Sequence, residues 1–226
     1  MKVLVACKES QRVCIEFRKL GHEAYSCDIE PCSGGHPEWH IQDDVLPLLN
    51  GNCDFQTVNG DMHSLIGKWD MIIAFPPCTY LTNAGARHLY KGGCLNVERY
   101  KKGIEAKNFF MMFYNADCDR ICIENPTPSR IYSLPEKSQV IQPYYFGHPY
   151  TKRTLLWLKG LPLLKATNLV EPLFAFCPSG SYSRTHADKH RGVFTTDRAK
   201  YRSKTFNGVA SAMAEQWGNF DLRSHE

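Results

Sequence analysis

Two short motifs place reactive side chains directly after apolar runs of the chain. In Pro76-Pro77-Cys78 a cysteine follows two prolines, and in Glu124-Asn125-Pro126 a carboxylate is followed by an amide and a proline. Proline fixes φ, so both side chains are expected on stiff turns. A positioned thiolate and a nearby carboxylate suit covalent catalysis. The alternatives are a structural thiol in a turn and a surface acid that ends a strand.

The elements that must position these motifs alternate between apolar strand-like runs and helical segments. Helices are expected from Ser10, as the N-cap, to about Leu20, from Asn96 to about Ala116, and from Val209 to Trp217. Strands are expected at residues 2–6, 24–27, 69–74, 121–123, 140–142 and 153–158. This pattern predicts an α/β fold, a mostly parallel sheet with helices on both faces. Ligands of such sheets bind beyond the carboxyl ends of the strands.

The two motifs resemble those of the cytosine C5 DNA methyltransferase family. Phe75-Pro76-Pro77-Cys78 is similar to the family's Pro-Cys nucleophile motif, and Glu124-Asn125-Pro126 to its Glu-Asn motif. Thr151-Lys152-Arg153-Thr154 resembles the Arg-bearing motif near the target base. The resemblance therefore implies Cys78, Glu124 and Arg153 as catalytic residues.

The same resemblance extends over nearly the whole chain and implies S-adenosylmethionine as cofactor, bound by a Rossmann-like methyltransferase fold. The implied cofactor-binding residues are Ala6, Cys7, Asp28, Ile29, Asp44, Pro76, Asn207 and Val209. Asp28 stands where an acid holds the ribose, Asp44 where an acid contacts the adenine amine, and 207–210 where the final motif packs against the cofactor. The stretch Gln142–Lys152 most closely resembles small phage and prophage methyltransferase-like proteins.

The implied reaction is methyl transfer to C5 of cytosine in DNA. Cys78 would add to C6, Glu124 would bond to N3 and the exocyclic amine, and Arg153 would steady the base carbonyl. A base within a duplex must be flipped out or already unpaired. Only residues 155–206 separate the Arg motif from the last motif, so the target-recognition domain is reduced or absent and little sequence preference is expected.

Basic charge concentrates in the second half of the chain. Residues 129–226 hold 14 Lys and Arg against 7 Asp and Glu, whereas residues 1–128 hold 13 against 16. Aromatic residues interleave with the basic ones, as suits a phosphate backbone and unstacked bases. The expected nucleic-acid-binding residues, within a segment at about 159–204, are Arg184, Lys189, Arg191, Arg198, Lys200, Arg202 and Lys204. The alternative is a solvated loop.

Two other functions stay open. The short recognition segment would also suit a free cytosine nucleotide as the substrate. The loop Cys7–Gln11 has no glycine where the family is glycine-rich. A nucleic-acid-binding protein of the same fold without methyl transfer would explain that difference.

Length and composition fit one cytoplasmic domain spanning residues 1–226. Hydrophobic residues make up 43% and charged residues 22%, near the averages of globular proteins. No apolar run approaches the ~20 residues of a membrane helix. Reduced thiols are expected for the ten cysteines. Cys27, Cys32, His36 and His40 fall within 14 residues, unlike the two separated arms of structural zinc sites, so no metal is expected.

Overall fold

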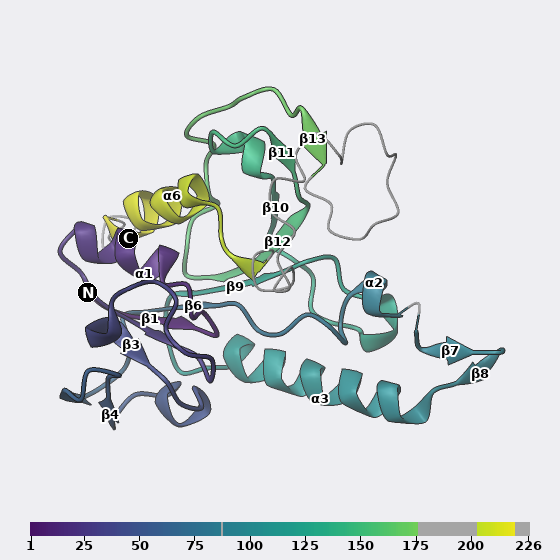
Figure 1. The fold of residues 1–226 in the computed structure, drawn as a ribbon, viewed down its shortest axis with the longest axis horizontal. Coiled ribbons are helices and arrows are strands. Elements are labelled where there is room, and N and C mark those ends of the chain that lie inside the picture. The colour runs from purple at the N-terminus through teal and green to yellow at the C-terminus, as the bar shows by residue number, and fades with distance from the viewer. Residues whose placement is uncertain (87, 176–202, 220–226) are drawn as a thin grey trace.

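The computed structural model describes residues 1–86, 88–175 and 203–219 (Figure 1). Its centre is a seven-stranded sheet in the order β10-β12-β9-β6-β1-β2-β3. The strands of this sheet are β1 (Lys2–Ala6), β2 (Glu23–Cys27), β3 (His40–Ile41), β6 (Met71–Ala74), β9 (Ile121–Asn125), β10 (Gln139–Ile141) and β12 (Thr154–Lys159).

The sheet is mostly parallel, as the continuous apolar strands predicted. β3, β2, β1, β6 and β9 run parallel to one another, and β12 is antiparallel to both of its neighbours. The chain order of the five parallel strands is that of the doubly wound dinucleotide-binding folds. The expected α/β architecture is therefore confirmed at the level of a Rossmann-like sheet.

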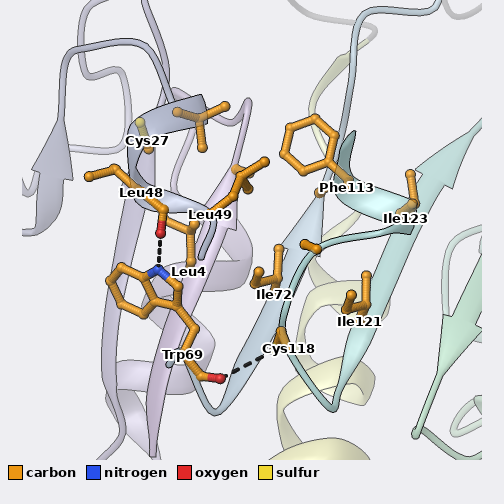
Figure 2. Close-up of a cluster of buried hydrophobic side chains, with 14 of the residues drawn as sticks. Leu4, Cys27, Leu48, Leu49, Trp69, Ile72, Phe113, Cys118, Ile121 and Ile123 are labelled. Carbon is orange, nitrogen blue, oxygen red and sulfur yellow. Dashed lines mark hydrogen bonds between the residues drawn. The ribbon is translucent and has the colours of Figure 1, made fainter. Parts of the chain in front are cut away.

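Helices cover both faces of this sheet. Helix α3 (Val97–Tyr114) packs Phe110 and Phe113 on one face, together with Leu4, Ile72 and Ile123. Figure 2 shows that layer, in which the Trp69 indole N–H donates to the carbonyl oxygen of Leu48 at 2.7 Å.

The opposite face carries α1 (Arg12–Lys19) and α6 (Asn207–Gly218), which lie side by side (Figure 1). Val13 and Phe17 of α1 and Met213 and Trp217 of α6 bury against it. Alternate residues of β1 point to the two faces, as the period of two in a strand requires.

Shorter elements extend from this core. Two hairpins and a two-stranded ladder are formed by β4 (Cys53–Gln56) with β5 (Met62–Leu65), β7 (Tyr90–Lys91) with β8 (Cys94–Leu95), and β11 (Tyr150–Thr151) with β13 (Phe174–Ala175). Within the described ranges, the remaining helical pieces are α2 (Asn83–Ala86) and the 3-10 turns Pro37–Trp39, Leu46–Leu48, Arg130–Tyr132 and Pro143–Tyr145. None of the helices within the described ranges combines the length and apolar character needed to cross a bilayer.

The observed helix boundaries agree only in part with those predicted from the sequence. Asn96 caps α3 as expected, its side chain accepting from the Arg99 N–H at 3.0 Å. The expected Ser10 cap is wrong: α1 begins at Arg12 after Gln11, which has a left-handed backbone (φ 56°). The Ser10 hydroxyl is buried and has no hydrogen-bond partner in the described part of the chain.

Candidate functional site

The Cys78 motif leaves β6 at the carboxyl end of the sheet. Phe75 and Pro76 are buried, and Cys78 is half-buried. The Cys78 carbonyl oxygen accepts from the N–H groups of Leu81 and Thr82, each at 3.1 Å. The cysteine therefore begins a tight turn, and the two prolines fix the direction of entry.

Glu124 lies on the neighbouring strand. β6 and β9 pair in parallel with Ala74 opposite Ile123, so Phe75 and Glu124 leave the ladder side by side. The two strands are adjacent, so the Cys78 and Glu124 motifs lie next to each other at the carboxyl end of the parallel strands. Glu124 is half-buried and, being part of β9, is held by the strand itself.

Hydrogen bonds join the loops that follow the two strands. The Asn125 side-chain amide donates to the Pro76 carbonyl oxygen at 3.1 Å. The Asn83 N–H donates to the Thr127 carbonyl oxygen at 3.2 Å, and the Ser129 N–H donates to the Leu81 carbonyl oxygen at 2.6 Å. The turn carrying Cys78 is thus fixed relative to Glu124 by three cross-links.

A narrow pocket opens beside Glu124, with about 360 Å³ of empty space that includes its solvent-exposed mouth. Its lining comes from four strand ends and from α6: Phe75, Glu124, Ile141, Pro143, Lys152, Thr154, Ser203, Thr205, Phe206, Val209 and Met213. Cys78 is not among these residues. The pocket is therefore built around Glu124 rather than around the thiol.

The basic residue of this pocket is Lys152. Arg153, the residue expected near the target base, is exposed, whereas Lys152 and Thr154 on either side line the pocket. Successive side chains of an extended chain point to opposite sides, so only one of Lys152 and Arg153 can face Glu124. That alternation is a signal the sequence already carries.

Lys8 is a second cation at the site, and sequence reasoning missed it. It follows β1, is 3% exposed, and donates from Nζ to the carbonyl oxygen of Ser203. The same Nζ lies 4.4 Å from the centre of the Phe75 ring. Burial lowers the pKa of Lys8 to about 8, although the nearby Glu124 carboxylate opposes that shift.

The loop after β1 adopts glycine-like conformations without glycine. Cys7 and Gln11 have φ values of 57° and 56°, in the left-handed region that glycine favours. The Gln11 side chain offsets this strain: it donates to Ser26 Oγ at 3.1 Å and to the His36 carbonyl at 2.9 Å, and accepts from the His36 N–H at 3.0 Å. The loop is thereby fixed against residues 32–36.

Three of the expected cofactor residues gather at the ends of β1, β2 and β3. Burial is the main cause that raises the pKa of the Cys7 thiol, and the Asp28 and Asp44 carboxylates add to it. Burial raises the pKa of the Asp28 carboxyl, and the Glu30 N–H, which donates to it at 3.1 Å, opposes this. Ile29, next along the chain, is 74% exposed.

The other expected cofactor residues take different positions. Ala6 is buried and its carbonyl oxygen accepts from the Phe75 N–H at 3.0 Å, which joins β1 to the nucleophile loop. Pro76 is buried beside it, and Val209 lines the Glu124 pocket. Asn207 is exposed at the first turn of α6.

The stretch Gln142–Lys152 contributes Pro143 and Lys152 to the lining of this pocket and contacts the start of α6. The Gln142 side chain accepts from the Lys152 N–H at 2.8 Å, and His148 Nε2 accepts from the Gly208 N–H at 3.0 Å. A Cβ at Gly208 would collide with the carbonyl oxygen of Phe146, so only glycine permits this close approach. The stretch therefore fixes the start of α6 over the pocket.

The expected nucleic-acid-binding segment, at about 159–204, is described only at residues 159–175 and 203–204. Arg184, Lys189, Arg191, Arg198, Lys200 and Arg202 lie outside the described residues. Lys204 lies within them and is half-buried.

No cluster of metal-ligating side chains occurs in the described ranges. Both ring nitrogens of the buried His40 are engaged, Nδ1 with Ser26 Oγ at 2.9 Å and Nε2 with the Glu30 carbonyl at 3.1 Å. Cys32 donates to the Gln11 side chain at 3.1 Å. These contacts use the side chains that a local metal site would need.

In two comparisons with known proteins, neither a protein-family model nor a curated protein matches this chain.

Proposed function

We propose that this protein transfers a methyl group from S-adenosylmethionine to C5 of cytosine in DNA. The observation that carries the proposal is the cross-linked pair of loops in which Cys78 and Glu124 follow adjacent parallel strands. Cross-linked loops hold the cysteine and the carboxylate in a fixed arrangement, which favours binding of one base by both.

The proposed chemistry begins at C6 of cytosine. The Cys78 thiolate forms a bond to C6, and the electron pair of the C5–C6 double bond is displaced onto C5 and, through C4, onto N3. A protonated Glu124 would stabilise that charge by donating to N3, while its other oxygen accepts from the exocyclic amine. After C5 has gained the methyl group, its proton leaves to a base, the double bond re-forms and the thiolate departs.

Lys152 is the side chain of this chain best placed to help Glu124 hold the base. It lines the Glu124 pocket, and a cation there favours a negatively charged ring. Arg153 stays a proposed contributor at the exposed rim. Both residues belong to the motif that resembles the Arg-bearing motif of the family.

The residues at the ends of β1–β3 fit S-adenosylmethionine in their chemistry. When bound, the cofactor supplies an electrophilic methyl group. Asp28 offers a carboxylate to ribose hydroxyls, Ile29 offers an exposed apolar side chain to the flat adenine ring, and Asp44 offers an acceptor to its amine. The left-handed Cys7 and Gln11 fit a loop that a ligand approaches closely.

A nucleic-acid-binding protein without methyl transfer is the second candidate, and Lys8 favours it. Its buried side chain extends from the β1 loop to Phe75 and Ser203, beside the proposed cofactor site. Titrating S-adenosylmethionine by calorimetry separates the two candidates. Heat of binding supports the enzyme, and its absence supports the binding protein.

An oligonucleotide with 5-fluorocytosine tests the proposed chemistry directly. Fluorine cannot leave as a proton, so the enzyme should remain bonded through Cys78 after methyl transfer, and mass spectrometry should show the adduct. Cys78→Ala should form none, Glu124→Gln should form it more slowly, and Cys94→Ala, at an exposed cysteine of β8, should match the wild type. An adduct that survives Cys78→Ala would refute the mechanism. A free 5-fluorocytosine nucleotide that reacts as fast as the oligonucleotide would support the nucleotide substrate instead.

A further inference from the structure

A second concave surface lies beside the turn that carries Cys78. It encloses about 740 Å³, including space open to solvent, and is lined by Tyr80, His88, Asn96, Glu98, Arg99 and Lys102. Tyr80 comes from the Cys78 turn, and the last four residues come from the start of α3 and its cap. Figure 1 shows the β7–β8 hairpin extending beyond this end of α3. We refer to this surface as the Tyr80 groove.

The segment that forms the Tyr80 groove is a basic island in an acidic half of the chain. Residues 79–107 hold six Lys and Arg and two Asp and Glu, whereas the rest of residues 1–128 holds seven against fourteen. One of the two acids, Glu98, lies in the first turn of α3, where a carboxylate is favoured by the helix dipole. The remaining charge of the groove lining is positive, from Arg99 and Lys102.

An aromatic ring lies among these cations. The Arg99 guanidinium is 5.1 Å and the Lys102 ammonium 5.8 Å from the centre of the half-buried Tyr80 ring. The Arg99 Nε–H donates to the Gly85 carbonyl oxygen at 3.1 Å, which orients its guanidinium. Cations beside an aromatic ring are the usual way in which proteins hold a phosphate backbone and an unpaired base.

The position of the groove relative to Cys78 matches the spacing of nucleotides. One residue, Thr79, lies between Cys78 and Tyr80, so their Cα atoms are at most about 7 Å apart. Stacked nucleotides of one strand rise about 3.4 Å each. The groove therefore lies within reach of a phosphate one or two nucleotides from a base held at Cys78.

We propose that the Tyr80 groove binds the phosphate backbone of single-stranded nucleic acid next to the target base, with Arg99 and Lys102 as phosphate contacts and Tyr80 as a stacking surface. The inference rests on the proposed function for the identity of that base. It adds a binding surface in the first half of the chain to the segment expected at Arg184–Lys204.

Oligonucleotide binding without S-adenosylmethionine tests the groove separately from methyl transfer. The probe is a fluorescein-labelled ten-nucleotide oligodeoxycytidine, followed by anisotropy from low to high salt. Lys102→Ala should weaken binding and lower the slope of log affinity against log salt by about 0.7, the value for one lost phosphate contact. Tyr80→Leu should weaken binding without changing that slope, because it removes stacking but no charge.

Three further variants separate the possible failures. Lys19→Ala removes an exposed cation of α1, outside both proposed nucleic-acid-binding surfaces, and should bind as the wild type does. Cys78→Ala should bind normally while forming no adduct. Arg99→Lys keeps the positive charge but removes the guanidinium that the Gly85 carbonyl oxygen orients. This variant therefore tests whether that orientation matters for binding.

Unchanged affinity and slope in both Lys102→Ala and Tyr80→Leu would overturn the groove proposal. A wild type that binds the oligonucleotide but transfers no methyl group would refute the proposed enzyme and leave the groove in place. Mononucleotides that bind as tightly as the oligonucleotide would overturn the groove, since it is argued to follow a strand.

Discussion

The Asn125 side chain donates to the Pro76 carbonyl oxygen at 3.1 Å, which joins the end of β9 to the loop that carries Cys78. Asn125 is fully buried, and its own Oδ1 has no hydrogen-bond partner within the described residues.

This contact predicts that Asn125→Ala weakens both the fold and the chemistry. The Pro76 carbonyl would lose its partner in a buried place, which costs about 1–3 kcal/mol of unfolding free energy. The Cys78 turn would also lose one of its cross-links to Glu124, so adduct formation should slow. Urea denaturation and the 5-fluorocytosine assay measure the two effects. Asn83→Ala, at an exposed side chain of α2, is the matched control. Adduct formation at the wild-type rate in Asn125→Ala would show that this contact does not position the thiol.

Much of this arrangement follows from sequence patterns that are local in the chain. Continuous apolar runs predicted the parallel strands β1, β6 and β9, and an asparagine before a long helical segment predicted the cap of α3. Strand β3 has only two residues, so no periodicity could reveal it.

The side chains that fill the site depend on contacts that are distant in the chain. Lys8 is buried where it contacts Ser203 and Phe75, whereas a lysine that follows a strand is normally exposed. Gln11 has a backbone conformation that favours glycine, and hydrogen bonds between its side chain and His36 hold it there. Neither the burial of Lys8 nor the conformation of Gln11 can be predicted without the tertiary structure.

The Asp28 carboxylate should contribute to cofactor affinity. Asp28→Ala removes a charge-assisted hydrogen bond to a ribose hydroxyl, worth about 1.5–3 kcal/mol, so S-adenosylmethionine should bind at least about tenfold more weakly. Calorimetry measures this change. Glu30→Ala, at an exposed acid two residues later, should leave the affinity unchanged. Equal affinities in wild type and Asp28→Ala would remove Asp28 from the proposed site.

His148 should make the protein less stable as the pH falls. Its Nε2 accepts from the Gly208 N–H, which requires a neutral ring, and burial lowers its pKa below 6.5, with Arg12 adding to that effect. Because the folded-state pKa is the lower one, the unfolded chain binds the proton more readily, and stability is lost as the pH falls through 6.5. His148→Gln keeps an acceptor at the same reach but does not titrate. As the pH falls from 7 to 5, the unfolding free energy of the wild type should therefore decrease relative to that of His148→Gln. A difference that stays constant across this range would contradict the neutral-acceptor role.

Lys8 gives a pH dependence of the same sign, at alkaline pH. The pKa of Lys8 is lowered from 10.5 to about 8 in the folded protein, mainly by burial. Below pH 8 the ammonium is charged in both states, and its burial costs about 3 kcal/mol, at about 1.4 kcal/mol for each pKa unit. Between pH 8 and 10.5 the folded protein releases this proton while the unfolded chain keeps it, so the cost disappears as the pH rises. Lys8→Met retains the apolar stem and removes the titration. Relative to this variant the wild type should gain stability from pH 8 to pH 10.5, as measured by urea denaturation at each pH. Lys19→Met, at an exposed lysine of α1, controls for the loss of one surface charge. If the wild-type and Lys8→Met curves run parallel over this range, Lys8 is not a buried cation of the site.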